Sequence, residues 1–193
     1  MENKKKNLIL DAAKSRFDRY GFKKTTIDEI CGSAKISKKT VYDFFKGKED
    51  ILVSLFIREA FSARKAVLSK IDNVIDPKEK IDKLLRVARG YFGEGQFMVK
   101  ILKDDKGLYA PFLHQKYYEL VENGILNIIS DILKQGIRKG EFRKLDPKIG
   151  SYIIFKLFQA FTYAATSQVK NQVEKDKVMD ELLDFIFKGI GRQ

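Results

Sequence analysis

The fold is decided by residues 21–52, which read GFKKTTIDEICGSAKISKKTVYDFFKGKEDIL. Within this stretch Thr26 precedes Glu29 by three residues, which is the pattern of a capping box at the start of a helix. Ser37 has a side-chain oxygen suited to cap a second short helix. The spacing therefore predicts a helix-turn-helix over residues 26–45, with two short helices joined by a tight turn.

Apolar residues predict which faces of these two helices are buried. The first helix runs from Thr26 to about Ser33, the turn is Ala34-Lys35-Ile36, and the second helix reaches Phe44 or Phe45. The expected inner residues are Ile27, Ile30, Cys31, Ile36, Val41, Phe44 and Phe45. The expected outward residues are Lys38, Lys39, Thr40, Tyr42 and Asp43. Lysine can donate to guanine or phosphate, and hydroxyls can donate to phosphate oxygens, so this outward face suits the major groove of DNA.

Periodicity and punctuation predict helix along the rest of the chain. An apolar stripe made of Leu8, Leu10, Ala12, Ala13 and Phe17 predicts a first helix that ends at Tyr20, before Gly21. Asp76-Pro77 and Asp146-Pro147 each place a capping acid before a proline at the first helical position. Further helices are expected over 48–71, 77–92, 95–105, 110–138, 147–169 and 173–190. Period-two strand patterns are not evident, so the predicted class is all-α with about nine helices.

The net charge of +12 is concentrated at the amino-terminal end. Residues 1–48 contain 13 basic and 6 acidic residues, a balance of +7, whereas residues 49–193 contain 25 and 20, a balance of +5. This concentration indicates a polyanionic partner, and charge alone leaves open nucleic acid, an anionic membrane surface or a basic solubilising surface. Lys4, Lys5 and Lys6 are expected to form either an arm that reaches DNA or a tail without a defined contact.

Composition excludes several other classes of protein. The single cysteine, Cys31, leaves no internal disulfide and no cysteine-rich zinc module. Apolar runs fall short of the roughly 18 residues that span a bilayer, and the start lacks a signal-peptide core, so we expect a cytoplasmic protein that does not engage the membrane. The sequence shows no Ser/His/Asp set, glycine-rich phosphate loop or metal-ligand cluster. We therefore expect no catalysis, no cofactor and no metal, and place the only histidine, His114, at the surface or at a helix cap.

Three ordered motifs resemble the TetR family of bacterial transcriptional regulators. They are the G-x-x-x-T-T-I start at Gly21, the S-x-x-T-V-Y segment at Ser37 and the F-x-x-K-E segment at Phe45, within a match of roughly residues 8–55. The resemblance implies a three-helix DNA-binding head over residues 3–63 and a helical domain for ligand binding and dimerisation over residues 64–193.

Two positions depart from the family pattern. Lys35 stands in the turn where the family usually has glycine, so this residue is expected to adopt a positive φ at a cost of about 1 kcal/mol. Lys39 also stands where glycine is common, and it adds charge where the second helix meets DNA. Neither change alters the expected fold. Because both residues lie in or beside the expected DNA-binding helix, the operator sequence of a relative is not expected to apply to this protein.

The resemblance implies DNA contacts from both ends of the motif. The residues expected at phosphates are Thr25, Thr26, Tyr42 and Lys48. Those expected at base edges are Lys38, Lys39 and Thr40. Each of these lysines could instead be a solvated charge. The complete set of expected DNA-binding residues is Thr25, Thr26, Lys38, Lys39, Thr40, Tyr42, Lys46 and Lys48.

The carboxy-terminal part is expected to supply a dimer interface and an effector pocket. The last helix is apolar on more of its circumference than one core face requires, so a partner helix is expected on it. The expected interface residues are Phe158, Phe161, Ala164, Leu182, Phe185 and Ile186. The expected ligand-binding residues are Tyr91, Phe97, Tyr109, Phe112, Tyr117, Phe155 and Phe158, although aromatic residues at helical spacing fit a plain core equally well.

These features together predict a sequence-specific transcriptional regulator. The leading hypothesis is a homodimeric repressor that leaves a palindromic operator when a small hydrophobic effector binds. The alternative is a helix-turn-helix protein whose carboxy-terminal domain serves dimerisation or protein partners without an inducer.

Overall fold

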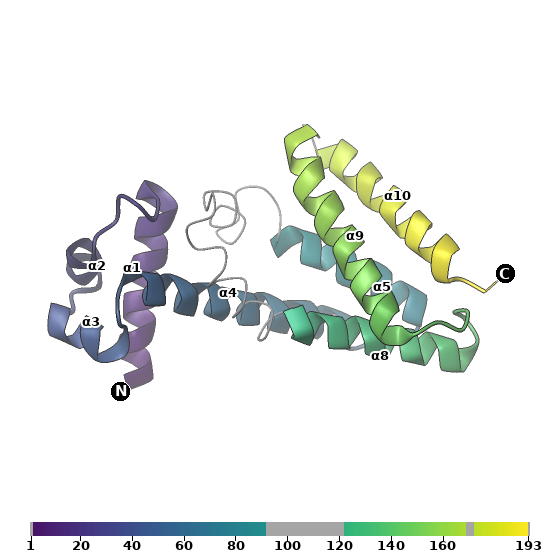
Figure 1. Ribbon diagram of the computed structural model, residues 1–193, viewed down its shortest axis with the longest axis horizontal. Coiled ribbons are helices and arrows are strands. Elements are labelled where there is room, and N and C mark those ends of the chain that lie inside the picture. Colours follow the sequence, from purple (N-terminus) through teal and green to yellow (C-terminus); the bar gives the residue numbers. More distant parts are fainter. Residues whose placement is uncertain (1, 92–121, 169–171, 193) are drawn as a thin grey trace. The chain divides into compact units, whose positions relative to one another are not determined.

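The computed structural model describes residues 2–91, 122–168 and 172–192 (Figure 1). Within these ranges the chain forms eight helices, and the only β-type pairing is an isolated bridge between Phe142 and Gly191, which confirms the all-α class. The helices are α1 (Glu2–Tyr20), α2 (Ile27–Ala34), α3 (Lys38–Phe44), α4 (Lys48–Ile71), α5 (Pro77–Tyr91), α8 (Asn123–Lys139), α9 (Pro147–Gln168) and α10 (Gln172–Ile190). The helix predicted over 95–105 and the first part of the one predicted over 110–138 lie outside the described residues.

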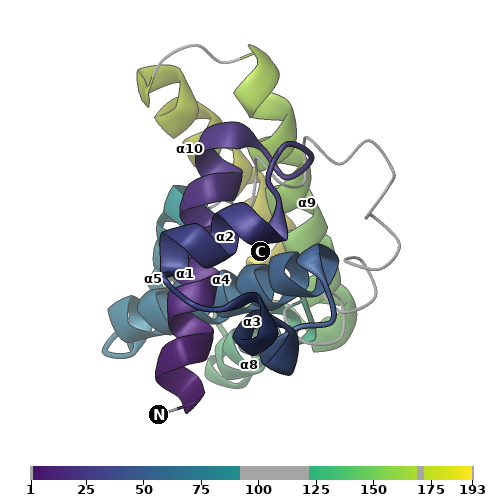
Figure 2. The same cartoon turned by 90° about the vertical axis from the view of Figure 1, so that its left-hand side faces the viewer.

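The first compact unit takes in the chain up to Phe61. In this unit α1 packs against α2, and α2 packs against α3 (Figure 2). The predicted stripe of α1 faces the core only in part, because Leu10, Ala13 and Phe17 are buried whereas Leu8 is 45% exposed. The buried residues of this unit include Ile9, Leu10, Ala13, Phe17, Ile30, Val41, Phe45, Ile51, Leu52, Leu55 and Phe56.

The amino-terminal lysines belong to a helix, which corrects the expectation of an arm or a tail. Lys4, Lys5 and Lys6 lie in the first turns of α1, which begins at Glu2. Lysine favours helix, and the Lys6 ammonium lies 5.7 Å from the centroid of the Phe45 ring, so this turn gains a contact with the core.

Ion pairs tie α1 to α4 within this unit. The Lys14 ammonium pairs with the Glu59 carboxylate, and Arg58 Nη2 lies 2.8 Å from Asp11 Oδ1. Arg58 Nη1 also donates to the Asn7 carbonyl at 3.5 Å. The amino-terminal half of α4 is therefore held along α1 by three separate contacts.

The second compact unit begins at Ser62, within α4. Its helix α8 packs on α5 and α9, and α10 packs on α9 and α5. One apolar cluster joins these elements, and it contains Val67, Ile71, Ile81, Leu84, Leu85, Ile129, Ile132, Leu133, Phe142, Ile154, Phe155, Phe158, Met179, Leu182, Leu183, Ile186 and Ile190. Arg86 Nη2 lies 2.6 Å from Asp180 Oδ1, which adds a charged contact between α5 and α10.

The two predicted Asp-Pro caps are confirmed. The Asp76 carboxylate accepts from the Glu79 N–H at 2.6 Å, at the start of α5. The Asp146 carboxylate accepts from the Lys148 N–H at 2.8 Å, at the start of α9. Each acid satisfies an otherwise unpaired amide of the first helical turn, so both helices begin at the residue where the sequence places the proline.

Candidate nucleic-acid interface

Local capping builds the two helices of the motif. The Thr26 hydroxyl accepts from the Glu29 N–H at 3.2 Å, and the Glu29 carboxylate accepts from the Thr26 N–H at 2.8 Å, so the predicted capping box is confirmed. These hydrogen bonds lower the pKa of Glu29, with smaller contributions from the charges of Arg16 and Lys48. The Ser37 hydroxyl accepts from the Thr40 N–H at 3.2 Å and caps α3.

The turn between α2 and α3 passes through a left-handed residue. Lys35 has φ of 54° and ψ of 43°, and it is the only non-glycine residue with positive φ among those described. Its N–H caps α2 by donating to the Gly32 carbonyl at 3.4 Å, and the Ile36 N–H donates to the Cys31 carbonyl at 3.1 Å. The positive φ expected at this position is confirmed, and it turns the chain from α2 into α3.

The two helices bury one face and expose the other. Ile30, Cys31, Val41 and Phe45 are buried, and the remaining predicted inner residues, Ile27, Ile36 and Phe44, are half-buried. Burial raises the pKa of the Cys31 thiol, and the charge of Asp28 adds to this effect. On the outward side Lys38, Lys39, Tyr42 and Asp43 are exposed and Thr40 is half-buried. The exposed face of α3 therefore presents two ammonium groups, a phenol and one carboxylate.

The two exposed lysines of α3 differ in their partners. The Lys38 ammonium lies 2.8 Å from Asp28 Oδ1 on α2, and this carboxylate raises the pKa of Lys38. Among the described residues, no hydrogen bond or ion pair engages the Lys39 ammonium. Lys46, just beyond α3, is also exposed, and its backbone N–H donates to Asp50 Oδ2 at 3.0 Å.

The two threonines before α2 have different surroundings. Thr26 is exposed and its hydroxyl belongs to the capping box. Thr25 is 1% exposed, and its hydroxyl donates to the Gly21 carbonyl at 2.9 Å. In this conformation the Thr25 hydroxyl stabilises the turn between α1 and α2 and is not presented to a phosphate.

Lys48 also faces inward, at the first residue of α4. Its ammonium donates to the carbonyls of Thr25 at 2.7 Å, Phe22 at 2.9 Å and Lys23 at 3.5 Å. The ammonium lies 4.4 Å from the centroid of the Phe22 ring. Sequence reasoning missed this arrangement, because its acceptors are backbone carbonyls 23 to 26 residues away and no side-chain pattern marks them.

The predicted interface residues divide between core and surface. Phe158, Leu182 and Ile186 are buried within the protomer, whereas Phe161 and Phe185 are 41% and 66% exposed. The side chain of Ala164 lies outside the described part of the chain.

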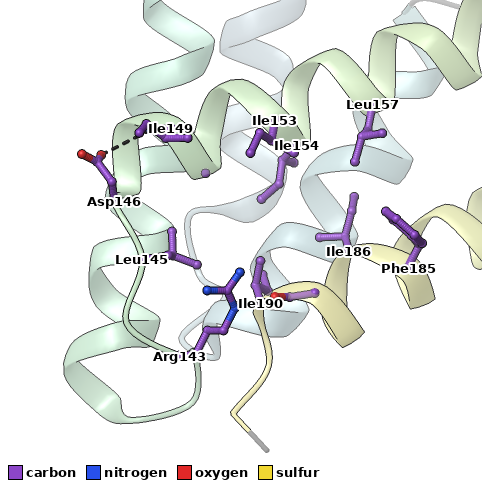
Figure 3. A pocket seen from close by; sticks show the side chains of 12 residues that line it. Arg143, Leu145, Asp146, Ile149, Ile153, Ile154, Leu157, Phe185, Ile186 and Ile190 are labelled. Atoms are coloured by element: carbon purple, nitrogen blue, oxygen red, sulfur yellow. Dashed lines mark hydrogen bonds between the residues drawn. The ribbon is translucent and has the colours of Figure 1, made fainter.

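An apolar groove lies on the surface where α9 meets α10. Ile149, Ile153, Leu157 and Phe161 recur every four residues along α9, and Ile149 and Ile153 are 60% and 51% exposed. The groove between the two helices has a volume of about 260 Å³. The side chains that line it include Ile153, Leu157, Phe185 and Ile186 (Figure 3). Arg143 and Asp146 lie at one end of this groove (Figure 3).

Three of the predicted ligand-binding residues are described. Phe155 and Phe158 are 3% exposed within the core, and Tyr91 packs against it partly buried. The other four predicted ligand-binding residues and the only histidine lie outside the described residues; they are Phe97, Tyr109, Phe112, Tyr117 and His114.

Within the described ranges, no three His, Cys, Asp or Glu side chains come together as a metal site requires. None of the described helices combines the length and apolar content needed to cross a bilayer.

A capped helix, a left-handed turn and a second short helix with an exposed cationic face together define the class: a helix-turn-helix DNA-binding protein. Comparison with known proteins identifies the family. Residues 9–55 match the family described as bacterial regulatory proteins, tetR family. The segment 9–55 belongs to this TetR family, and the similarity of the chain to transcriptional regulators makes it a transcriptional regulator and not an enzyme.

Similarity to known regulators extends over nearly the whole chain. The HTH-type transcriptional regulator YhgD of Bacillus subtilis is 26% identical over 190 residues, which is 96% of each chain. The fatty acid metabolism regulator protein of Bacillus subtilis is 26% identical over 185 residues, covering 94% of this chain and 93% of that one. The fold is similar to that of the fatty acid degradation regulator FadR of Bacillus halodurans, with a TM-score of 0.74, 23% identity and coverage of 93% and 94%.

Proposed function

We propose that this regulator is a homodimeric repressor that binds a palindromic operator and leaves it when a small apolar effector binds. In this proposal residues 3–63 are the DNA-binding head and residues 64–193 are the regulatory domain. The observation that carries it is the exposed face of α3, where Lys39 and Tyr42 project from a helix fixed by the Ser37 cap and the buried Val41.

The head is suited to enter the major groove with α3. Lys39 can donate to guanine O6 and N7 or to a phosphate, and the Tyr42 hydroxyl can donate to a phosphate oxygen. Lys46 follows the last residues of α3. Thr26 is the cap of α2, and unpaired amides in the first turn of a helix favour an anion. Thr40 and Lys38 complete the proposed DNA-binding face, and Lys38 first has to leave Asp28.

The groove between α9 and α10 supports the dimer. An exposed apolar surface spans these two neighbouring helices, and it includes Ile149, Ile153, Phe161 and Phe185. Covering this surface with a second copy removes it from water and stabilises the dimer. A dimer with two-fold symmetry carries two α3 helices, which can read half-sites about 34 Å apart in a palindrome.

The names of the relatives support an acyl-type effector. Two of the similar proteins are named as regulators of fatty acid metabolism or degradation. We propose that the effector is a fatty acid or an acyl thioester, and that it binds the regulatory domain in a conformer whose heads no longer match the half-site spacing. An effector can shift this equilibrium only through its different affinity for the two conformers, and α4 is the element proposed to carry the change.

The DNA-binding part of the proposal is tested through Lys39. Binding of the wild-type protein to a duplex that it selects from a random library is measured against salt concentration, alongside Lys39→Ala. Loss of one phosphate or base contact is expected to weaken binding, and loss of a phosphate contact lowers the slope of log K against log salt by about 0.9 for each protomer. An affinity and slope equal to those of the wild type would contradict the role of Lys39.

The effector part is tested by thermal unfolding. Saturated fatty acids and acyl thioesters of increasing chain length are added to the full-length protein, with aromatic compounds and cationic drugs as comparison ligands. A ligand at 100 times its dissociation constant stabilises the folded state by about 2.7 kcal/mol, which raises Tm measurably. An acyl ligand that raises Tm is then expected to release the selected duplex. If no ligand in any class raises Tm, the alternative of a regulatory domain that serves dimerisation or protein partners is supported.

A further inference from the structure

The ammonium of Lys48 lies within hydrogen-bond distance of three backbone carbonyls. Its acceptors are the carbonyls of Thr25, Phe22 and Lys23, at 2.7, 2.9 and 3.5 Å. An ammonium has three donors and no acceptor, so three carbonyl acceptors match its donor number. The Phe22 ring lies below the ammonium, 4.4 Å away, and Phe22 in turn packs against Phe17 with ring centroids 5.2 Å apart.

The three carbonyls belong to the turn that connects α1 to α2. This turn is also closed from within, because the Thr25 N–H donates to the Phe22 carbonyl at 3.3 Å and the Thr25 hydroxyl donates to the Gly21 carbonyl at 2.9 Å. The next residue, Thr26, is the cap of α2. Lys48 therefore joins the first residue of α4 to the segment that sets where α2 begins.

We propose that Lys48 is a positioning residue for DNA recognition, which fixes the α1–α2 turn, and through it α2 and α3, to the start of α4. Its contribution to DNA binding comes from placing the recognition helix, and its charge does not neutralise a phosphate. This inference rests on DNA binding by the head and does not depend on the effector or on the dimer.

The test compares two duplexes and several variants. One probe is the duplex that the wild-type protein selects from a random library, and the other is an unrelated duplex of the same length. Lys48→Met keeps most of the aliphatic stem over Phe22 but removes the three donors. Lys48→Arg restores several donors, and Lys70→Met is the matched control, because it removes the same charge from an exposed position of the same helix.

The expected result separates positioning from phosphate contact. Lys48→Met is expected to lose about tenfold or more of the affinity for the selected duplex, since hydrogen bonds to a charged group are among the stronger ones. Its affinity for the unrelated duplex and its salt slope are expected to match the wild type. Lys48→Arg is expected to recover most of the loss, and Lys70→Met to bind both duplexes as the wild type does.

Other outcomes overturn the proposal. Equal losses on both duplexes with a slope lower by about 0.9 for each protomer would make Lys48 a phosphate contact. A lower Tm with an unchanged ratio of the two affinities, measured where both proteins are folded, would make its role only structural. If Lys48→Met does not fold, Lys48→Gln takes its place, because it keeps two N–H donors without the charge; an unchanged affinity ratio in that variant also contradicts positioning. If the proposed repressor mechanism is wrong but the Lys48 proposal is right, the ratio of affinities for the selected and unrelated duplexes still falls in Lys48→Met. In that case acyl ligands fail to release the wild-type protein from the selected duplex.

Discussion

At the scale of single residues, one acid controls a lysine of the recognition helix. The Asp28 carboxylate on α2 holds the Lys38 ammonium on α3 at 2.8 Å, and both side chains are more than half exposed. Such an exposed pair adds little to stability, and the raised pKa of Lys38 means that its small contribution is present below the ordinary value of 10.5 and is lost as pH rises above the raised value. The consequence for the proposed function is larger, because in that proposal Lys38 exchanges this carboxylate for DNA.

Replacing Asp28 is therefore expected to strengthen DNA binding. In Asp28→Asn the Lys38 ammonium loses its partner and a negative charge disappears from the DNA-binding face. We expect higher affinity for an unrelated duplex, measured by fluorescence anisotropy, with a salt slope close to that of the wild type, because Lys38 reaches DNA in both proteins. Asp43→Asn is the matched control, because it removes an exposed acid from α3 itself without releasing Lys38. An affinity for Asp28→Asn no higher than that of Asp43→Asn would show that releasing Lys38 from Asp28 does not help DNA binding.

Lys35 stores backbone strain in the turn. Its φ of 54° is costly for a residue with a Cβ atom, by roughly 1–2 kcal/mol, while glycine avoids that cost but loses more entropy on folding. We expect Lys35→Gly to be more stable than Lys35→Ala by about 1 kcal/mol in urea unfolding. Both variants remove the same charge, so their difference isolates the backbone term. Equal stability would mean that the turn relaxes to a negative φ without cost.

At the scale of elements, short-range signals were sufficient to predict much of the fold. Thr26, Glu29 and Ser37 act on amides within three residues, so the starts of α2 and α3 could be predicted from spacing alone. The bounds predicted for α4, residues 48–71, agree with the structure for the same reason, since Gly47 and the polar first turn mark its start.

Contacts between distant segments could not be predicted in this way. The contacts of the Lys48 ammonium are an example, because its carbonyl acceptors lie 23 to 26 residues away in the chain and no side-chain pattern marks them. The apolar residues of α10 were expected at an interface as one group, although Leu182 and Ile186 face the core and Phe185 faces outward. Hydrophobicity marks both kinds of position equally, and only the packing of α10 against α9 and α5 distinguishes them.

One glycine of α8 is required by close packing. An ideal Cβ on Gly136 would meet the Phe142 ring at 2.1 Å, and the Gly136 carbonyl accepts from the Phe142 N–H at 3.2 Å, so the ring has little room to move. We expect Gly136→Ala to destabilise the protein by about 1–3 kcal/mol in urea unfolding. Gly90→Ala is the control, because a Cβ at this helical position meets nothing within 4 Å; we expect it to be neutral or stabilising by up to about 1 kcal/mol. Similar effects of the two substitutions would contradict the steric explanation.

At the scale of the whole molecule, the basic charge of the amino-terminal part is unevenly available. Lys14 pairs with Glu59, Lys38 pairs with Asp28, and Lys48 is directed to backbone carbonyls. Lys39 and Lys46 are exposed beside or within α3. Some of these cations are paired within the head, so the balance of +7 in residues 1–48 is larger than the positive charge available to a duplex. A second head in a dimer would double the number of available cations and strengthen binding.

In the proposed dimer the second head depends on the groove between α9 and α10, and Phe185 provides the test. Its side chain is 66% exposed on the protomer, so Phe185→Glu leaves the core intact but places a carboxylate where we propose that a second copy packs. We expect the dissociation constant of the dimer to rise by about 100-fold or more in sedimentation experiments, because a buried charge without a partner is strongly unfavourable.

The same variant is expected to lose affinity for the selected duplex, since binding by one head no longer brings the second head to the other half-site. Ile75→Glu is the control, because Ile75 is 75% exposed in the loop between α4 and α5 and does not line the groove. A Phe185→Glu protein that stays dimeric, or an Ile75→Glu protein that dissociates as readily, would place the dimer interface elsewhere. Dissociation of Phe185→Glu alone, together with weaker DNA binding, would show that the apolar surface outside the protomer core is what makes two heads act as one.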